Sequence, residues 1–422
     1  MARKMKDSGI EWIGEIPEGW RTINPKALFT QRKDKAQKGE RQLTSSQQYG
    51  ILYQDDYMEL TGSKVVTVEK DFDILKHVEA GDFVISMRSF QGGLEYSTKS
   101  GAISSAYVML VPNLELVYPH FYRWLLKSSV YIDALQRTTN MVRDGQAMRY
   151  SNFAQVRLFT LPLDEQKSRA DFLDLECSSI DKILFKTRSS IEEYKKLKQA
   201  VITQAVTKGV RGEREMKDSG VEWIGEIPKE WDILDLVAHT SMLTPMRDRP
   251  ENLDGPIPWI RIEDFDGKYI SSSKASLGVS KETVRSMNLK IYPVGTILCT
   301  SSCIMGKCAI VSRELVSNQR FIGIIPDQNT CENFLYYLML SNSERMNYLA
   351  TGALQANLSR SSFEHLKVQF PSYQEQKEIS DYLDTKCAEI DKLIAKKEQL
   401  VKELESYKKS LIYEVVTGKR EV

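Results

Sequence analysis

The sequence predicts an α+β fold in which two mixed α/β domains are joined by two long, antiparallel coiled-coil helices. Two observations carry this prediction. The stretch from Glu165 to Thr207 recurs without a gap from Glu375 to Thr417, with an offset of 210 residues. In both copies apolar residues recur in alternating steps of three and four, the spacing of a coiled-coil helix. The chain is therefore an internal repeat with pseudo-two-fold character.

The repeat divides the chain into four segments. The first domain is expected over residues 1–163 and the first helix over 164–215. The second domain is expected over 216–373 and the second helix over 374–422. A chain of 422 residues is too long for one ordinary hydrophobic core, and its length alone favours two or three domains.

An isolated helix of this kind would expose its apolar seam to water. The seam begins with Leu173, Cys177, Ile180 and Leu184 in the first copy and with Leu383, Cys387, Ile390 and Ile394 in the second. Each helix follows a proline and ends near a glycine, and each spans about 65 Å at 1.5 Å per residue. We expect the two copies to pair with each other, antiparallel if the halves are related by a two-fold axis. The alternative is two separate helices, each packed on its own domain.

A second repeat lies at the start of each domain. Residues 5–20 match residues 216–231 at 13 of 16 positions. Because its glycines and proline disfavour both helix and strand, we expect an ordered, turn-rich segment docked by its tryptophans.

The two domains share a layout but differ in most residues. In the first, strands are expected at 64–68, 82–86 and 106–111, followed by a helix from Pro119 to about Ala134. In the second, strand-like runs at 295–300 and 321–326 and a helical run at 333–339 take the corresponding places. The near-identical repeats are then scaffold, and the divergent parts are carried by it.

Composition excludes several classes of protein. No apolar run approaches the roughly 18 residues that span a bilayer, and the first residues lack the apolar core of a signal peptide, so we expect a cytoplasmic protein. Cys299, Cys303 and Cys308 suggest a metal site, but they lie in an apolar strand-like run without a nearby histidine, and the structural alternative is favoured. No phosphate loop, dinucleotide-binding or metalloprotease motif is present, and we predict a non-catalytic chain without a catalytic or metal site.

The divergent regions offer basic residues mixed with amides, hydroxyls and aromatics. Arginine and lysine pair with guanine edges and phosphates, and asparagine and glutamine pair with adenine edges. The candidate DNA contacts are Arg32, Lys33, Arg88, Gln91, Arg143, Arg149, Tyr150, Arg247, Ser302, Lys307, Arg320 and Arg360. Arg249 and Gln319 lie in the same stretches. For any one of them the alternative is a solvated loop residue. The net charge of +1 requires any positive DNA-binding surface to be local or supplied by partners.

Three motifs give the chain a family resemblance. The segment from Met5 to Trp20 with its repeat, the Glu-Gln-Lys that opens each long helix, and the Val-Thr near each helix end resemble the specificity subunit of Type I restriction-modification systems. The resemblance covers the whole chain and is specific in the repeats and loose in the domains. It implies two target recognition domains alternating with two helical regions.

The resemblance also implies a function and partners. Each recognition domain is expected to read one half of a split double-stranded DNA sequence, while the helices set the gap and hold two modification (methyltransferase) subunits. Two restriction (motor-nuclease) subunits join for cleavage. S-adenosylmethionine, ATP and Mg²⁺ are then cofactors of these partners, and none is expected in this chain.

Two other interpretations remain. One is a coiled-coil scaffold that binds no DNA and uses its two domains to hold proteins. A gel shift with purified chain and modification subunit separates it from the DNA-reading interpretation. The other is a recognition module detached from a fused restriction-methylation enzyme, which the neighbouring reading frame would reveal.

Overall fold

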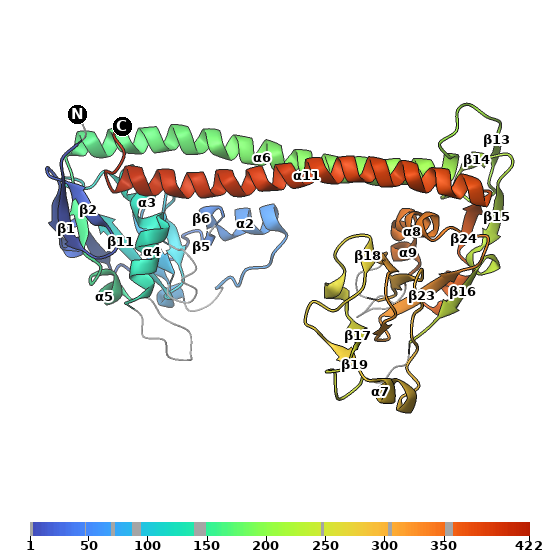
Figure 1. The fold of residues 1–422 in the computed structure, drawn as a ribbon. Coiled ribbons are helices and arrows are strands. Elements are labelled where there is room, and N and C mark those ends of the chain that lie inside the picture. Colours follow the sequence, from blue (N-terminus) through green and yellow to red (C-terminus); the bar gives the residue numbers. More distant parts are fainter. Residues whose placement is uncertain are drawn as a thin grey trace. The chain divides into compact units, whose positions relative to one another are not determined.

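The computed structural model describes residues 3–46, 48–68, 72–86, 94–138, 149–245, 249–302, 306–350 and 358–422. The chain divides into two compact units, unit 1 with Met1–Arg188 and Gln399–Val422, and unit 2 with Ser189–Glu398. The long helices α6 (Leu163–Lys208) and α11 (Tyr373–Val416) therefore contribute residues to both units (Figure 1). Within the described part, no helix is long and apolar enough to cross a membrane.

Unit 1 is built on a four-stranded antiparallel sheet of order β4-β11-β8-β9. Its strands are β1 (Met5–Ile10), β2 (Gly14–Pro17), β3 (Arg21–Ile23), β4 (Phe29–Arg32), β5 (Leu43–Ser46), β6 (Gly50–Tyr53), β7 (Lys76–Val78), β8 (Phe83–Ser86), β9 (Leu94–Tyr96), β10 (Gly101–Ile103), β11 (Tyr107–Pro112) and β12 (Leu158–Thr160). Its shorter helices are α1 (Pro25–Leu28), α2 (Gln54–Thr61), α3 (Pro119–Lys127), α4 (Ser129–Gln136) and α5 (Tyr150–Phe153).

Unit 2 repeats this plan with a five-stranded sheet of order β16-β23-β20-β21-β18 and a second sheet of order β19-β17-β22. Its strands are β13 (Met216–Asp218), β14 (Glu226–Pro228), β15 (Asp232–Asp235), β16 (Thr240–Leu243), β17 (Ile257–Ile260), β18 (Tyr269–Ile270), β19 (Gly278–Val279), β20 (Ile297–Thr300), β21 (Cys308–Val311), β22 (Val316–Ser317), β23 (Phe321–Pro326) and β24 (Lys367–Phe370). Its shorter helices are α7 (Lys281–Ser286), α8 (Glu332–Ser341), α9 (Ser343–Leu349) and α10 (Arg360–Glu364).

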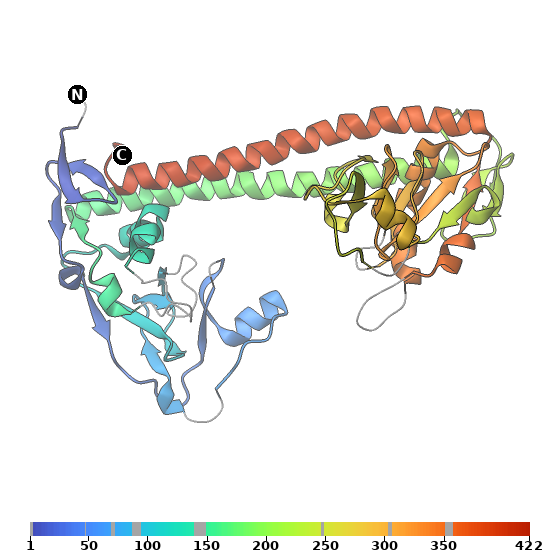
Figure 2. The same ribbon diagram turned by 60° about the horizontal axis from the view of Figure 1, so that its bottom comes forward.

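Within each unit α6 and α11 pack together in antiparallel directions, and the two ribbons run side by side in both views (Figures 1 and 2). In unit 1 Lys408 Nζ lies 2.6 Å from Asp181, and in unit 2 Lys198 Nζ lies 2.7 Å from Asp391. Each lysine is the other's counterpart in the repeat, and so is each aspartate. A polar residue at a seam position fixes the register of paired helices. The predicted pairing of the two helices is confirmed.

The helix ends are joined to the domains by a tryptophan and a glutamate in each unit. Trp20 Nε1 donates to Glu165 at 3.1 Å, and Trp231 Nε1 donates to Glu375 at 3.0 Å. Both indoles are almost fully buried. Although burial acts to raise the pKa of Glu165, hydrogen bonds from Arg3 and other donors bring it below its usual value. The two repeated motifs of the sequence are therefore one structural joint.

The glutamine beside each glutamate secures a second segment. The amide of Gln166 donates to Leu116 O and Leu161 O, both at 2.9 Å, and accepts from the N–H of Tyr118 at 2.7 Å. Gln376 makes the equivalent three bonds in unit 2, to the main chain at Asn329, Pro371 and Cys331. The loop that leads into α3 or α8 is thus anchored on a long helix.

The repeat of residues 5–20 and 216–231 differs from its prediction. Instead of a turn-rich segment without strands, residues 5–17 form the hairpin β1–β2, with a register shift between Asp7 and Ile10. Residues 216–228 form the shorter hairpin β13–β14. Gly9 and Gly14 adopt positive φ angles of 66° and 73°, so these glycines shape the hairpin instead of preventing it.

Two further expectations of the first domain are wrong. Residues 64–68 form no strand, because the main chain of Val68 is bonded to the side-chain amide of Gln42, at 2.9 Å and 2.7 Å. The helix expected from Pro119 to Ala134 is interrupted at Ser128, whose backbone is extended and whose hydroxyl donates to Leu125 O at 2.6 Å. A serine that bonds to nearby backbone competes with helix continuation in this way.

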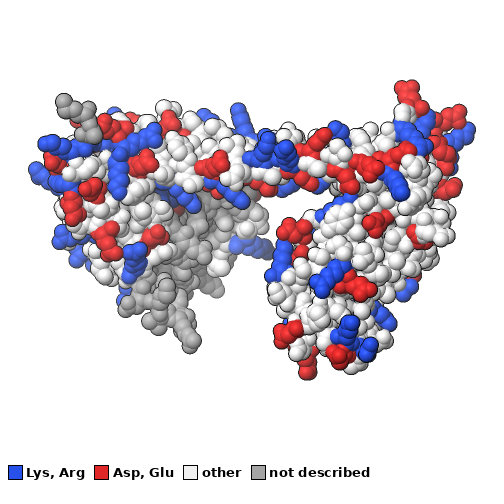
Figure 3. Space-filling model, in the orientation of Figure 1, with Lys and Arg blue, Asp and Glu red and all other residues white. Residues whose placement is uncertain are grey.

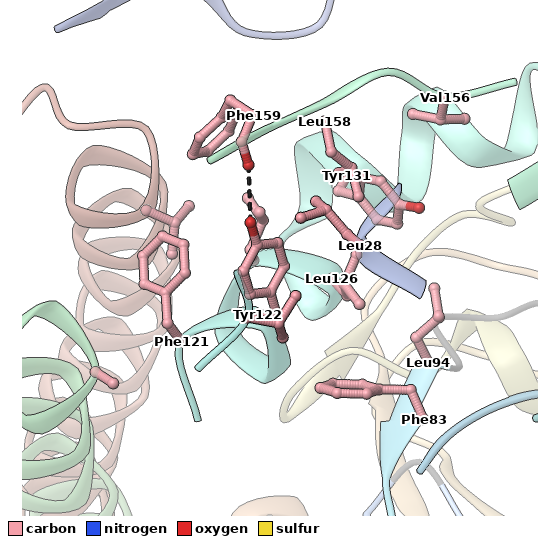
Figure 4. Close-up of a cluster of buried hydrophobic side chains, with 14 of the residues drawn as sticks. Leu28, Phe83, Leu94, Phe121, Tyr122, Leu126, Tyr131, Val156, Leu158 and Phe159 are labelled. Carbon is pink, nitrogen blue, oxygen red and sulfur yellow. Dashed lines mark hydrogen bonds between the residues drawn. The ribbon is translucent and has the colours of Figure 1, made fainter. Parts of the chain in front are cut away.

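The core of unit 1 draws on residues distant in sequence. Figure 4 shows part of it, with the hydroxyl of Tyr122 on α3 pointing to the main chain of Phe159 on β12. That bond measures 2.9 Å and satisfies the polar atom of a fully buried ring. Leu411, Val415 and Val416 from the end of α11 belong to the same core.

The antiparallel pairing in unit 1 can be tested by a cross-link. Arg169 on α6 donates to Val415 O on α11 at 2.8 Å. Leu173 lies about one turn after Arg169 and Leu411 about one turn before Val415, so in an antiparallel pair both leucines lie on the same side of this bond. With both leucines replaced by cysteine, oxidation should give a disulfide within one chain, seen as faster migration on a non-reducing gel. A matched control places the first cysteine at Leu175, which is 67% exposed. Bridges only between chains would contradict the pairing.

Candidate nucleic-acid interface

The structure describes eight of the twelve predicted DNA contacts. Arg88, Gln91, Arg143 and Arg247 lie outside the described residues. The remaining eight do not form one cluster, since four belong to each unit. The prediction that any of them contacts DNA stays a prediction, but the structure gives several of them other contacts.

Arg32 at the end of β4 is held by carboxylates. Its Nε and Nη2 donate to the two oxygens of Asp82 at 2.7 Å and 3.1 Å, and its Nη1 donates to Asp34 at 3.1 Å. The Asp82 side chain is 2% exposed and that of Arg32 is 19% exposed. The hydrogen bonds to Asp82 are the main reason that the pKa of Arg32 is raised. This guanidinium is therefore an internal partner of a buried carboxylate.

Of the other predicted residues of unit 1, one supports a helix and two are exposed on the surface. Tyr150 donates from its hydroxyl to Phe29 O at 2.9 Å and stacks on Phe153, so its ring supports the start of α5. Arg149 precedes α5, with its main-chain N–H bonded to Asn152 Oδ1 at 3.0 Å and its side chain exposed. Lys33 is exposed beside Arg32.

In unit 2 the predicted residues also differ in accessibility. Ser302 is buried, at 6% exposure, so its hydroxyl is not presented at the surface. Lys307 is exposed just before β21, and its main-chain N–H donates to Thr300 Oγ1 at 3.2 Å. Arg360 at the start of α10 pairs with Glu364 at 2.7 Å. Arg320 is exposed before β23, with its main-chain N–H bonded to Asn318 Oδ1 at 3.0 Å.

Arg320 belongs to a cavity of about 300 Å³ that we call the arginine pocket. Its lining residues are Arg249, Trp259, Arg261, Asn318, Gln319 and Arg320. Arg249 and Gln319 stood in the basic stretches of the sequence, whereas Trp259, Arg261 and Asn318 were missed. Arg261 was missed because it is a single arginine after an apolar run, and only strand pairing brings it beside Arg320.

Parallel pairing of β17 and β22 builds this pocket. Trp259 pairs with Val316 and Ile260 with Ser317, so Arg261 and Asn318 leave the same edge of the sheet side by side. The segment after β17 is held by the buried carboxylate of Asp264, which accepts the N–H of Arg261 at 2.7 Å. The pocket thus combines a fixed frame with cationic and amide donors.

Unit 1 has a cavity of a different character. It measures about 550 Å³ and includes the aromatic residues Tyr49, Tyr96 and Trp124. Glu95 in its wall pairs with Lys127 at 2.7 Å, and burial raises the pKa of this carboxyl above its usual value. The three cations in its wall, Arg123, Lys127 and Lys408, are each paired with a carboxylate of the chain.

The cysteines considered as a metal site are strand neighbours in the core. Cys299 on β20 pairs with Cys308 on β21, and their sulfurs lie 2.7 Å apart. Burial raises the pKa of the Cys299 thiol well above its usual value, which disfavours the thiolate that a metal requires. Cys303 lies outside the described residues, among which no group of three metal-ligating side chains occurs.

Charged residues of both signs are interspersed over the face seen in Figure 3, along the helices and on both units. This agrees with the near-balance of 58 basic and 57 acidic residues in the sequence. A positive surface on this chain would therefore have to be formed by a local group of cations.

The Arg32 pair gives a test of structural against functional roles. Replacing Arg32 by methionine leaves the charge of Asp82 buried, so the unfolding free energy should fall by about 3 kcal/mol. Lys33→Met, a matched exposed neighbour, should change it by less than about 0.5 kcal/mol. Urea denaturation measures both. Equal stability of the two variants would mean that Arg32 is free to contact DNA.

Comparison with known proteins adds independent findings. The family model described as "Type I restriction modification DNA specificity domain" matches residues 229–403. The Type I restriction enzyme MjaIX specificity subunit of Methanocaldococcus jannaschii is 34% identical over 179 residues, which is 41% of each chain. The putative type I restriction enzyme MjaX specificity subunit of the same organism is 23% identical over 96% of this chain and 95% of that subunit.

Solved structures share the fold. A chain from a structure titled as the basis of complex assembly and conformational transition of the type I R-M system superposes with a TM-score of 0.73, at 12% identity over 96% of this chain and 99% of the other. The HsdS subunit from Thermoanaerobacter tengcongensis gives a TM-score of 0.50 at 12% identity, over 96% and 98%. Residues 229–403 thus match the DNA specificity domain of Type I restriction-modification systems, and nearly the whole chain is similar in sequence to a specificity subunit of such a system and shares the fold of the solved structures.

Proposed function

We propose that this chain is the non-catalytic DNA-reading subunit of a Type I restriction-modification complex, in which each unit reads one half of a two-part DNA sequence. The proposal rests on the observation that the two units have the same scaffold but carry different residues on it. The joint of tryptophan, glutamate and glutamine is the same in both units, whereas the candidate DNA contacts differ. A shared frame with exchangeable reading surfaces suits a target that is read in two independent halves.

Equivalent aspartates of the two long helices are bonded to different residues of the two domains. Asp174 on α6 accepts from Trp124 Nε1 at 2.7 Å and also pairs with Arg123. Its repeat counterpart Asp384 on α11 accepts instead from the hydroxyl of Tyr337 at 2.6 Å. The helix keeps its carboxylate while each domain supplies its own donor, so the domains can change without altering the helices.

Methyltransferase subunits are the proposed partners of the helices. Ile183 and Tyr407 in unit 1 and Leu197 and Leu393 in unit 2 are between 41% and 48% exposed. Each stands one residue before a seam position, which in an antiparallel pair brings both members of a unit to one side. Since the repeat relates Ile183 to Leu393 and Leu197 to Tyr407, the same apolar surface occurs twice. Two equal surfaces support docking of two copies of one partner.

The catalytic parts of the complex are assigned to its other subunits. Two restriction subunits would complete the assembly, and S-adenosylmethionine, ATP and Mg²⁺ would act on the partner chains. The competing proposal, a protein scaffold that binds no DNA, rests on the same paired helices but gives no role to a pocket with three arginines. We therefore favour the DNA-reading function.

Exchange of one domain tests the proposal. Residues 21–161 are replaced by the corresponding region of another specificity subunit, and methylated sites are mapped after co-expression with the modification subunit. One half of the recognised sequence should change and the other half should stay the same, because the frame is retained. The reverse exchange in unit 2 is the matched control. If both halves changed, the domains would not read separately, and if no DNA were recognised the scaffold proposal would be preferred.

We further propose that the helix pair sets the gap between the two half-sites. Each long helix runs through both units, and α6 has 46 residues without a break. One heptad inserted after Ser190 and one after Leu400 keep the seam in register and lengthen each helix by about 10 Å. At about 3.4 Å per base pair the preferred gap should grow by about three base pairs.

Selection of methylated sites from a library with random gap lengths measures this change. Three base pairs also turn one half-site by roughly 100° about the duplex, so some loss of affinity is expected unless the DNA twists. The unmodified chain is the control, and the bases of both halves should be retained. An unchanged gap in a folded variant would exclude the helices as the spacing element.

A further inference from the structure

We propose that the arginine pocket of unit 2 is a phosphodiester-binding site that fixes the position of this unit on the DNA backbone. The inference rests on the proposed DNA-reading function and assigns a ligand to residues that have none so far. It concerns Arg249, Trp259, Arg261, Asn318, Gln319 and Arg320.

Charge is the first argument. Three of the six lining residues are arginines and none is acidic. Glu263 lies beside the pocket, where it is 3.1 Å from Arg261 Nη1, but its side chain is 60% exposed and it engages only one guanidinium nitrogen. Converging guanidinium groups without an equal number of carboxylates favour an anion, and on DNA the anions are the phosphates.

An unused donor is the second argument. The Nε atom of Arg261 is buried from solvent and has no hydrogen-bond partner among the described residues. A buried N–H without a partner is costly unless a ligand supplies the acceptor. A phosphate oxygen is an acceptor that also satisfies the charge of the same side chain.

The shape of the site favours a phosphate over the edge of a base. A guanine edge offers two acceptors to one bidentate arginine that reaches out into the groove. Here several donors from two strand ends and a preceding loop face a common hollow of about 300 Å³. Such convergence suits a tetrahedral group, which accepts hydrogen bonds from several directions.

The frame behind the donors is rigid. Asp264 binds the N–H of Arg261 at 2.7 Å and that of Lys274 at 2.8 Å. On the other side, Asn318 Oδ1 accepts the N–H of Arg320, and Arg320 O accepts the N–H of Ser301 at 2.8 Å. Backbone positions fixed in this way reduce the entropy lost when a ligand binds.

Methylphosphonate scanning tests the proposal on the full chain assembled with its modification subunit. A duplex carrying the selected target is prepared with one neutral methylphosphonate at each backbone position in turn, and its affinity is measured by fluorescence anisotropy. For the unmodified chain, one or two positions in the half-site of unit 2 should cost at least about tenfold in affinity. Arg320→Ala and Arg261→Ala should lose similar affinity for unmodified DNA and become insensitive to those positions.

Two controls separate the outcomes. Arg285→Ala removes an exposed arginine from α7 of the same unit and should keep both affinity and the scanning pattern. Arg320→Lys keeps a positive charge and should retain most binding to a phosphate, with the same bases selected. Removing one arginine that truly binds a phosphate should also lower the slope of log affinity against log salt by about 0.9.

Different results overturn the proposal in distinguishable ways. Relaxed selection at one base pair with an unchanged scanning pattern would make the pocket a base reader. Unaltered binding by both alanine variants would leave the pocket without a role on DNA while the DNA-reading function stands. If the unmodified complex bound no DNA, the proposed function and the phosphate site would fall together.

Discussion

Burial of the seam between α6 and α11 is the interaction on which both units depend. Leu173 near the start of α6 and Leu411 near the end of α11 lie in one hydrophobic core with Trp20. Ile202 and Leu383 play the same part in the core of unit 2 with Trp231. Each large apolar side chain so buried contributes about 1.5–3 kcal/mol relative to exposure. Neither core is complete until distant parts of the chain have met.

This dependence explains why the repeats are so similar while the domains differ. The joint of Trp20 with Glu165, and of Trp231 with Glu375, transmits the position of each helix end to its domain through a buried hydrogen bond. Loss of a buried partner costs the full desolvation of the group left behind. The strands and loops beyond the joint carry no such requirement, so their residues can differ between the two units.

Near-neutral charge is compatible with DNA reading when cations are concentrated locally. The arginine pocket gathers three guanidinium groups around one hollow with a single carboxylate, Glu263, paired to one of them. Arg32 and Arg360, by contrast, each pair with carboxylates of the chain itself. Contacts to the DNA backbone, as proposed for this pocket, supply affinity without sequence information. Separate residues for backbone contact and for base reading would agree with a subunit that works inside a larger complex.

Heptad spacing and the 210-residue repeat were sufficient to predict the paired helices, because an apolar seam is stable only when another apolar surface covers it and the matching copy in the same chain supplies one. The strands at 82–86 and 321–326 were also predictable from apolar runs. What the tertiary structure alone decided was which polar groups face each other: Arg32 meets Asp82 across strands, and Arg261 meets Arg320 through parallel pairing. Such contacts depend on strand register, and local sequence patterns do not encode which distant residues a register brings together.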